Sequence, residues 1–295
     1  MNDTNKTLAT TLSSRGWRGA AIVDPGLTPI DWNSWLEVLT KNPASLPGFR
    51  QLKQGDDTNV FVTNLPPDLT VVVKHTHRTG LAARLARLVR SSAEAHECRL
   101  ALALSEAGIP TPRPLALFER TGRTCDSILL TRFVENLRDL DQVVMVELPR
   151  RKGPQLPRLK RDLAEQLAKT IADFHRAGFT HRDLKASNIL VQLPTNAGTA
   201  PSVWLVDLKG VSTSMNSAAT ILRALTRLAA SLLSYRALTH TDYARFLSHY
   251  LVVVGMGLDR RDWRKLYTAL ARDAHDYNRR AKSRKAGKID GYGGV

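Results

Sequence analysis

The segment HRDLKASN, residues 181–188, constrains this chain more than any other, because it leads directly into the apolar run ILV, residues 189–191. The first segment is mostly polar, whereas the second has the branched apolar side chains that favour a strand. Together they predict a polar loop that ends on a strand, which holds the carboxylate, ammonium and amide groups of the loop in fixed positions. The loop agrees with the pattern H-R-D-L-x-x-x-N at every specified position.

Other charged residues stand at the ends of strand-like runs. Asp207 follows the apolar residues 203–206, and Lys74 ends the β-branched run 70–74. Phosphoryl transfer needs cations beside the phosphates, a carboxylate aimed at the attacking hydroxyl group, and fixed geometry. The sequence supplies these parts in a fixed order.

The remaining pattern predicts a sheet-rich part followed by a mainly helical part. We expect strands, the first three as an antiparallel meander, over residues 49–55, 59–65, 70–75, 114–120 and 127–134. Helices are expected over residues 80–90, 92–107, 159–177, 217–234, 241–253 and 260–280. Residues 141–158 are expected to form a loop or a partial helix. The predicted organisation is an N-terminal extension (1–48), an N-lobe (49–135), a C-lobe (136–280) and a flexible basic tail (281–295).

The chain is strongly basic, with 43 Lys and Arg against 27 Asp and Glu and a formal charge of +16. Such a charge calls for an anionic partner. The two cysteines, Cys98 and Cys125, have no neighbours at metal-ligand spacing, so neither a disulfide framework nor a zinc site is expected from them. We expect a cytoplasmic protein, because no run of 18 apolar residues and no secretory signal is present.

On these residues the chain resembles the protein-kinase-like superfamily. The resemblance implies an α+β, bilobal fold with a small antiparallel-sheet N-lobe carrying one main helix, and a compact, mainly helical C-lobe. It implies that ATP and Mg²⁺ are the cofactors. Asp183 would then be the catalytic base, Lys185 would lie close to the γ-phosphate, and Asn188 and Asp207 would hold Mg²⁺.

The resemblance also implies a nucleotide-binding group in the N-lobe. Lys74 would pair with the α- and β-phosphates, and its partner would be a glutamate on the next helix. We prefer Glu97, and interpret Glu94 as a solvated charge near the helix N-terminus. Gly55, in the turn QGDDTN, is a candidate for the loop that covers the phosphates, although protein kinases have three glycines there.

Two departures from the protein-kinase pattern argue against a regulated protein kinase. The segment after the second aspartate reads Asp207-Leu208-Lys209-Gly210 in place of D-F-G, and no A-P-E follows it. Almost no activation segment is left before the helix at residue 217. A compact C-lobe without a peptide-docking platform suits a sugar better than a protein.

The chain is most similar to the lipopolysaccharide core kinases. The similarity rests on a glutamate-bearing helix that runs into GIPTP (108–112), on H-x-D-L-x-x-x-N-I-L (181–190), and on the helical segments 222–232 and 241–251. It implies transfer of the γ-phosphate of ATP to a hydroxyl group of Kdo or heptose in the inner core.

This resemblance implies an anionic glycolipid acceptor and peripheral contact with the cytoplasmic face of the inner membrane, whereas nucleic acid is not expected. The basic residues that would meet such a surface are Arg84, Arg87, Arg90, Arg150, Arg151, Lys152, Arg158, Lys160, Arg161, Arg279, Arg280, Lys282, Arg284, Lys285 and Lys288. Any of these clusters can equally be a solvated face.

Two other functions remain open. An atypical protein kinase or an antibiotic-type small-molecule kinase would share every residue named above. A basic pseudokinase scaffold is the third reading, although such proteins commonly lack at least one of Lys74, Asp183, Asn188 and Asp207.

Overall fold

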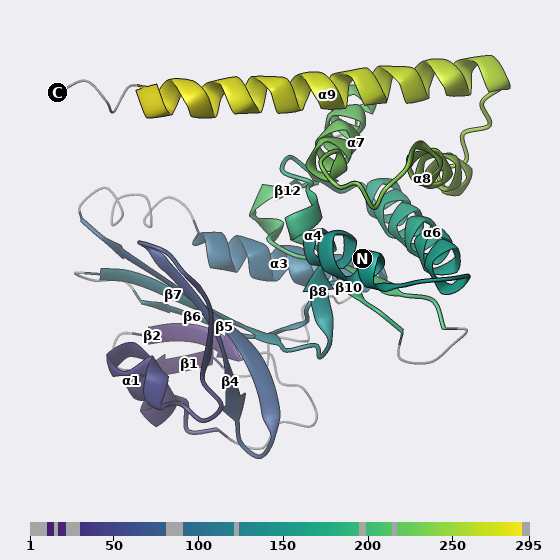
Figure 1. Ribbon diagram of the computed structural model, residues 1–295. Coiled ribbons are helices and arrows are strands. Elements are labelled where there is room, and N and C mark those ends of the chain that lie inside the picture. The colour runs from purple at the N-terminus through teal and green to yellow at the C-terminus, as the bar shows by residue number, and fades with distance from the viewer. Residues whose placement is uncertain are drawn as a thin grey trace, which may run out of the picture. The chain divides into compact units, whose positions relative to one another are not determined.

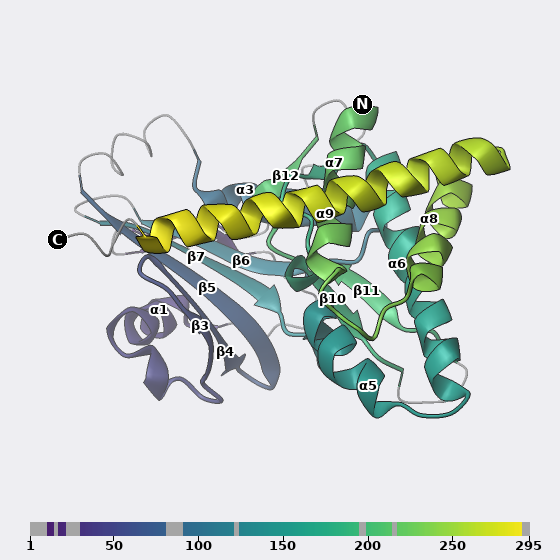
Figure 2. The ribbon, with the colours of Figure 1, turned by 45° about the horizontal axis from the view of Figure 1, so that its top comes forward.

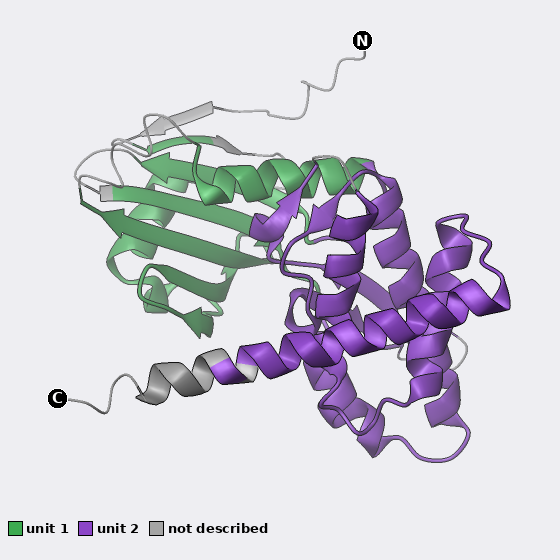
Figure 3. Ribbon diagram, turned by 90° about the horizontal axis from the view of Figure 1, so that it is seen from above, with its two compact units in different colours: residues 1–106, 112–134 green, residues 107–111, 135–295 purple. Residues whose placement is uncertain are grey.

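The computed structural model describes residues 11–14, 17–21, 30–80, 91–120, 124–194, 199–213 and 217–290. It divides into two compact units, shown in green and purple in Figure 3. The first comprises residues 1–106 and 112–134, and the second comprises residues 107–111 and 135–295. Residues 81–90, which include Arg84, Arg87 and Arg90 of the basic helix predicted over residues 80–90, fall outside the described ranges.

The first unit is built on a seven-stranded antiparallel sheet (Figure 1). Its strands, in chain order, are β1 (Thr11–Ser14), β2 (Trp17–Ala21), β3 (Arg50–Gln54), β4 (Thr58–Leu65), β5 (Leu69–Thr79), β6 (Pro114–Arg120) and β7 (Thr124–Arg132). They lie in the order β1-β2-β6-β7-β5-β4-β3. The predicted meander of three strands is confirmed as β3-β4-β5, and the two later strands are confirmed as β6 and β7.

Alternation along the strands gives the sheet two apolar faces, each covered by a helix. On one face, Leu117 and Leu129 pack with Cys98 of α3 (Ala93–Glu106). On the other face, the neighbours of those residues on β6 and β7 pack with α1 (Trp32–Lys41) and with Trp17 of β2. Because successive side chains on a strand point to opposite faces, residues two apart on β5 share a face.

The N-terminal segment therefore contributes to the core of this unit, where the sequence reading left residues 1–48 as an unassigned extension. β2 pairs with β6 along residues 17–21, and Trp35, Leu36 and Leu39 of α1 are buried. Asp31 caps α1 by accepting hydrogen bonds from the backbone amides of the first turn. The pairing of β2 joins residues about a hundred positions apart, which local patterns do not report.

The second unit is mainly helical and carries two small antiparallel sheets, β11-β10-β8 and β12-β9. Its strands are β8 (Leu137–Asp139), β9 (Thr180–His181), β10 (Ile189–Gln192), β11 (Ser202–Leu205) and β12 (Val211–Ser212). Its helices are α4 (Leu140–Gln142), a π-helix (Val143–Glu147), α5 (Leu148–Arg150), α6 (Gln155–Arg176), α7 (Ala218–Leu232), α8 (His240–Val253) and α9 (Arg260–Asp290). α6 packs against α8, and α9 lies across α7 (Figure 2).

The predicted helices of this unit are present, with changes at their ends. Leu163, Leu167, Ile171 and Phe174 form the buried face of α6, as their spacing predicts. α9 continues to Asp290, ten residues past its predicted end at residue 280, because residues 281–286 are mostly good helix formers and none of them stops a helix. Within the described ranges, no helix has the length and apolar composition to cross a bilayer.

One member of the predicted membrane-facing basic cluster has another role. Lys160 on α6 forms an ion pair with Asp242 of α8 at 2.5 Å, and the side chains of both residues are largely buried. Its charge is therefore used inside the unit and is not available to an anionic surface. Asp242 also closes the capping box of α8 by accepting from the backbone and the hydroxyl group of Thr239.

His175, at the contact between α6 and α8, is expected to make the free energy of unfolding depend on pH. It is buried on α6, its Nδ1 lies 2.8 Å from the hydroxyl oxygen of Tyr250 on α8, and burial lowers its pKa to about 4. The unfolded chain takes up this proton near pH 6.5, whereas the folded chain does so only near pH 4. The free energy of unfolding should therefore fall, by roughly 3 kcal/mol from this residue, as pH drops from 6.5 to 4.

Urea unfolding at pH 7 and at pH 4.5, on the wild type and on His175→Gln, measures this contribution. The fall in stability between the two pH values should be smaller in His175→Gln than in the wild type, because glutamine has no proton to take up. An equal fall in both proteins would contradict this role for His175.

Candidate functional site

The loop of residues 181–188 lies in the second unit and leads into a strand, as predicted; a short strand that was not predicted also precedes it. β9 ends at His181, residues 186–188 form a 3-10 helix, and β10 begins at Ile189. The amide of Ala186 donates to Ser231 Oγ of α7 at 3.0 Å, so the loop is tied to the helical core. The side chain of Asn188 is buried, and its Nδ2 donates to the backbone oxygen of Asp183 at 2.9 Å.

His181 supports the loop from inside. Its Nδ1 accepts a hydrogen bond from the amide of Asp183 at 3.0 Å, and burial lowers its pKa, which keeps the ring neutral and able to accept. Gly210 lies against this ring: a Cβ atom at residue 210 would stand 2.8 Å from His181 Cε1. The amide of Arg182 donates to the Gly210 oxygen at 2.9 Å. The glycine after Asp207 therefore allows the two chain segments to approach closely.

Asp183, Lys185 and Asp207 form one charged group on the second unit. Lys185 Nζ lies 2.8 Å from Asp183 Oδ2, and each of these side chains is about half exposed. The pKa of Lys185 is raised, chiefly by this hydrogen bond and also by the charge of Asp207. Asp183 is thus fixed at its backbone while its carboxylate still reaches solvent, as a group that meets a substrate must.

Asp207 is held in an unusual backbone conformation, with φ 56° and ψ 56°. Few residues other than glycine adopt these angles, and such residues concentrate at functional sites. The preceding residues are anchored on both sides. The amide of Val206 donates to the Asn188 oxygen, and the amide of Leu205 donates to the Pro110 oxygen. Pro110 and Thr111 therefore lie beside β11 and support the backbone that leads to Asp207.

In the first unit, Lys74 and Glu97 are partners, as predicted. Lys74 lies on β5 between Val60 of β4 and Leu129 of β7, and its Nζ lies 2.5 Å from Glu97 Oε2 of α3. Both side chains are mostly buried. The ion pair therefore holds the ammonium group of Lys74 in one position.

The interpretation of Glu94 as a solvated charge is wrong. Its side chain is 1% exposed, and it accepts hydrogen bonds from Thr76 Oγ1 at 2.7 Å and from Ser127 Oγ at 2.6 Å. Glu94 thus attaches the first turn of α3 to β5 and β7. Because Thr76 shares a face of β5 with Lys74, Glu94 and Glu97 dock α3 on the same strand.

Gly55 lies in the tight turn between β3 and β4, where its amide donates to the Thr58 oxygen at 3.0 Å. That donor is therefore already in use. The turn also carries two carboxylates, Asp56 and Asp57, whose negative charge would repel a phosphate. Of the groups predicted to touch the nucleotide, this turn has the weakest structural support.

The structure thus gathers the predicted residues into two groups. Asp183, Lys185, Asn188 and Asp207 belong to the second unit, and Lys74 and Glu97 to the first. Sequence reasoning missed the residues that support these groups, such as Ser231 and Thr76, because their partners lie far along the chain. It also passed over the alternation His75-x-His77 on β5, which a search for repeated histidines would have found.

Comparisons with known proteins agree on one family. A family model described as lipopolysaccharide kinase (Kdo/WaaP) family matches residues 53–250. Two proteins named 3-deoxy-D-manno-octulosonic acid kinase are similar in sequence. The one from Vibrio vulnificus (strain YJ016) is 29% identical over 48% of this chain and 56% of its own length. The one from Stenotrophomonas maltophilia (strain K279a) is 32% identical over 61% of this chain and 70% of its own length. The match thus spans little more than half of the Vibrio protein.

Solved structures confirm the predicted fold. The chain is similar to a structure titled "WaaP in complex with acyl carrier protein", with a TM-score of 0.57, 24% identity, and coverage of 84% of this chain and 98% of that one. It is also similar to the kinase domain of BubR1, with a TM-score of 0.50, 11% identity, and coverage of 91% and 87%. At these identities the similarity establishes the fold, and it is the α+β protein-kinase-like fold that the motifs imply.

Proposed function

We propose that this chain, which belongs to the lipopolysaccharide kinase (Kdo/WaaP) family, transfers the γ-phosphate of ATP to a sugar hydroxyl group of the lipopolysaccharide inner core. The observation that carries the proposal is the Asp183–Lys185 pair, held beside Asp207 and Asn188 on a loop with a fixed backbone. Relatives named as kinases of 3-deoxy-D-manno-octulosonic acid favour Kdo as the acceptor.

In this proposal Asp183 accepts the proton of the acceptor hydroxyl group. The hydroxyl oxygen forms a bond to the γ-phosphorus as the bond from that phosphorus to the β–γ bridging oxygen breaks, and ADP leaves. Lys185, 2.8 Å from Asp183, stays close to the transferred group and offsets its negative charge. The proton finally passes from Asp183 to solvent, which the half-exposed carboxylate can reach.

The residues present fit a magnesium ion. Asn188 Nδ2 is occupied by the Asp183 carbonyl, which leaves the amide oxygen as the atom that can ligate a metal. Asp207 presents an exposed carboxylate on the neighbouring segment. Mg²⁺ prefers oxygen ligands and typically takes one or two from the protein. Asn188 and Asp207 would hold it, and when bound it would neutralise charge on the phosphates.

We further propose that Lys74 contacts the α- and β-phosphates of ATP and that Glu97 fixes the position of Lys74. In this assignment Gly55 shapes the turn near the nucleotide and does not donate to it, since its amide already bonds Thr58.

A peripheral contact with an anionic membrane face belongs to the same proposal. Arg260, Arg261 and Arg264 line one side of the first turns of α9, together with Lys265 and Arg272. Each cation near an anionic surface contributes about 1 kcal/mol. Co-sedimentation with anionic and with neutral vesicles measures this contact, and more protein should sediment with the anionic vesicles. Equal recovery with both would contradict an electrostatic contact with the membrane.

A panel of acceptors tests the function. Purified protein with ATP and Mg²⁺ should phosphorylate core oligosaccharide that ends in Kdo or heptose, and do so with a higher kcat/KM than aminoglycosides or a generic protein substrate. A preference for an aminoglycoside or a protein would support the other kinase readings. Absence of both ATP binding and transfer would support a pseudokinase.

A further inference from the structure

Two histidines and an aspartate gather on the sheet of the first unit, on the face opposite Lys74. His75 and His77 lie two residues apart on β5, and Asp126 lies directly opposite His77 on the paired strand β7. Residues two apart share a face, so both histidines lie on the α1 side of the sheet with Val71 and Val73. Lys74 and Thr76 lie on the other side, with α3.

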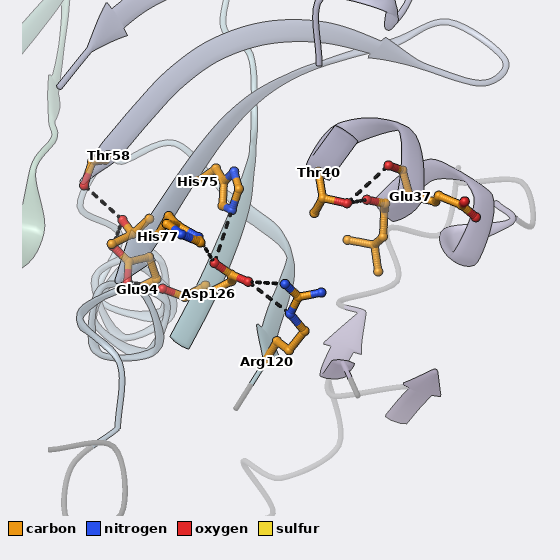
Figure 4. Close-up of polar contacts among 11 residues, drawn as sticks. Glu37, Thr40, Thr58, His75, His77, Glu94, Arg120 and Asp126 are labelled. Atoms are coloured by element: carbon orange, nitrogen blue, oxygen red, sulfur yellow. Dashed lines mark hydrogen bonds and ion pairs between the residues drawn. The ribbon is translucent and has the colours of Figure 1, made fainter. Parts of the chain in front are cut away.

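The three side chains point toward one another (Figure 4). His77 Nδ1 contacts Asp126 Oδ1, and His75 Nε2 lies 4.0 Å from the same oxygen. One ligand atom from each residue falls within 4.8 Å of the other two. We propose that His75, His77 and Asp126 form a site for a transition-metal ion, with Zn²⁺ as its natural occupant.

Hydrogen bonds within the cluster do not account for the environment of His75. Its Nε2 is buried and has no hydrogen-bond partner among the described residues. A buried polar nitrogen without a partner is costly, and a metal ion would satisfy it.

Asp126 is oriented for this role by Arg120. The guanidinium group donates from Nε and Nη2 to Asp126 Oδ2, at 3.0 Å and 2.8 Å, while Oδ1 faces the histidines. An outer residue that holds a ligating carboxylate by its second oxygen is a recurrent feature of metal sites. The carboxylate side chain is 2% exposed, so its negative charge is buried where a cation is favoured.

The three ligating groups favour Zn²⁺ over Mg²⁺ and Ca²⁺. Two imidazoles and one carboxylate suit Zn²⁺ with a fourth position for water, whereas Mg²⁺ and Ca²⁺ prefer oxygen ligands alone. In a tetrahedral site, Zn²⁺ bonds of about 2.0–2.2 Å place the ligand atoms about 3.3–3.6 Å apart. The three ligand atoms here lie within 4.8 Å of one another, so binding requires side-chain shifts of up to about 1.5 Å. The charge of Arg120 opposes the ion, and the affinity should be lower than that of a structural site with four protein ligands.

The experiment is calorimetric titration of Zn²⁺ into the full chain without a histidine tag, after removal of metal with a chelator. The wild type should bind one Zn²⁺ per chain, and Co²⁺ in its place should give the intense visible absorption of a four-coordinate ion. His75→Gln and His77→Gln should each weaken Zn²⁺ binding by at least about tenfold. His96→Gln, an exposed histidine of the same unit, is the matched control and should bind as the wild type does.

A wild type that binds no Zn²⁺ would overturn the proposal, as would unchanged affinity in both histidine variants. Asp126→Asn provides a further variant if either histidine change prevents folding, and circular dichroism establishes which variants are folded. Zn²⁺ bound equally by every folded variant would place the ion elsewhere and would also overturn the site. None of these readouts depends on the kinase activity.

Discussion

Replacing Asp183 with Asn is expected to lower kcat for phosphate transfer by roughly 10²–10⁴-fold and to leave the Kd for ATP nearly unchanged. The amide cannot accept the proton of the acceptor hydroxyl group. It would also present a donor to Lys185, which now donates to Asp183 Oδ2 at 2.8 Å. The loop itself should persist, because its hydrogen bonds with His181 and Asn188 use the backbone of Asp183 and not its carboxylate.

The measurement separates turnover from binding, with kcat from transfer to core oligosaccharide and the Kd from nucleotide titration. Asp173→Asn is a matched control, since Asp173 also pairs with a lysine at 2.6 Å but lies on α6 outside the proposed site. Its activity should equal that of the wild type. Turnover at the wild-type rate in Asp183→Asn would remove Asp183 as the base.

Asp207→Asn should weaken nucleotide binding in the presence of Mg²⁺ by at least about tenfold. Loss of residues that merely orient metal ligands typically costs 10–100-fold in affinity, and a direct ligand should cost no less. Asparagine is the appropriate replacement because it tolerates the left-handed backbone angles of Asp207, whereas alanine would add strain.

Nucleotide titrations with Mg²⁺ and with a chelator test this prediction. The wild type should bind ATP more tightly with Mg²⁺, and Asp207→Asn should lose most of that difference while its affinity without metal stays the same. Asp183→Asn serves as the comparison in which the effect of Mg²⁺ is retained. If Asp207→Asn kept the full effect of Mg²⁺, the metal would have to be held by other residues.

The segment after Asp207 shows how far the sequence could be read. Leu208 replaces the phenylalanine of D-F-G and is buried in a short 3-10 helix. The chain then forms β12, which pairs with β9 at His181, and so returns at once to the loop that carries Asp183. The absence of an A-P-E motif predicts such a short connection. The pairing of Val211 with His181 could not be predicted, because it joins residues thirty positions apart.

Where the sequence succeeded, the signal was local. The loop at residues 181–188, the apolar face of α6 and the run that ends at Lys74 are all read from neighbouring residues. Its errors concern charged residues whose partners are distant: Glu94 is held by Thr76 and Ser127, and Lys160 by Asp242. A charged residue on a helix is exposed in most proteins, and only the fold shows which one is buried with a partner.

The central claim is that this chain phosphorylates the lipopolysaccharide inner core, and mass spectrometry of the core from living cells tests it most directly. Three strains are compared: one with the wild-type protein, one without it, and one with Asp183→Asn. We predict that the core from the last two strains lacks the mass of one phosphate group relative to the first. Identical core masses in all three strains would contradict the claim.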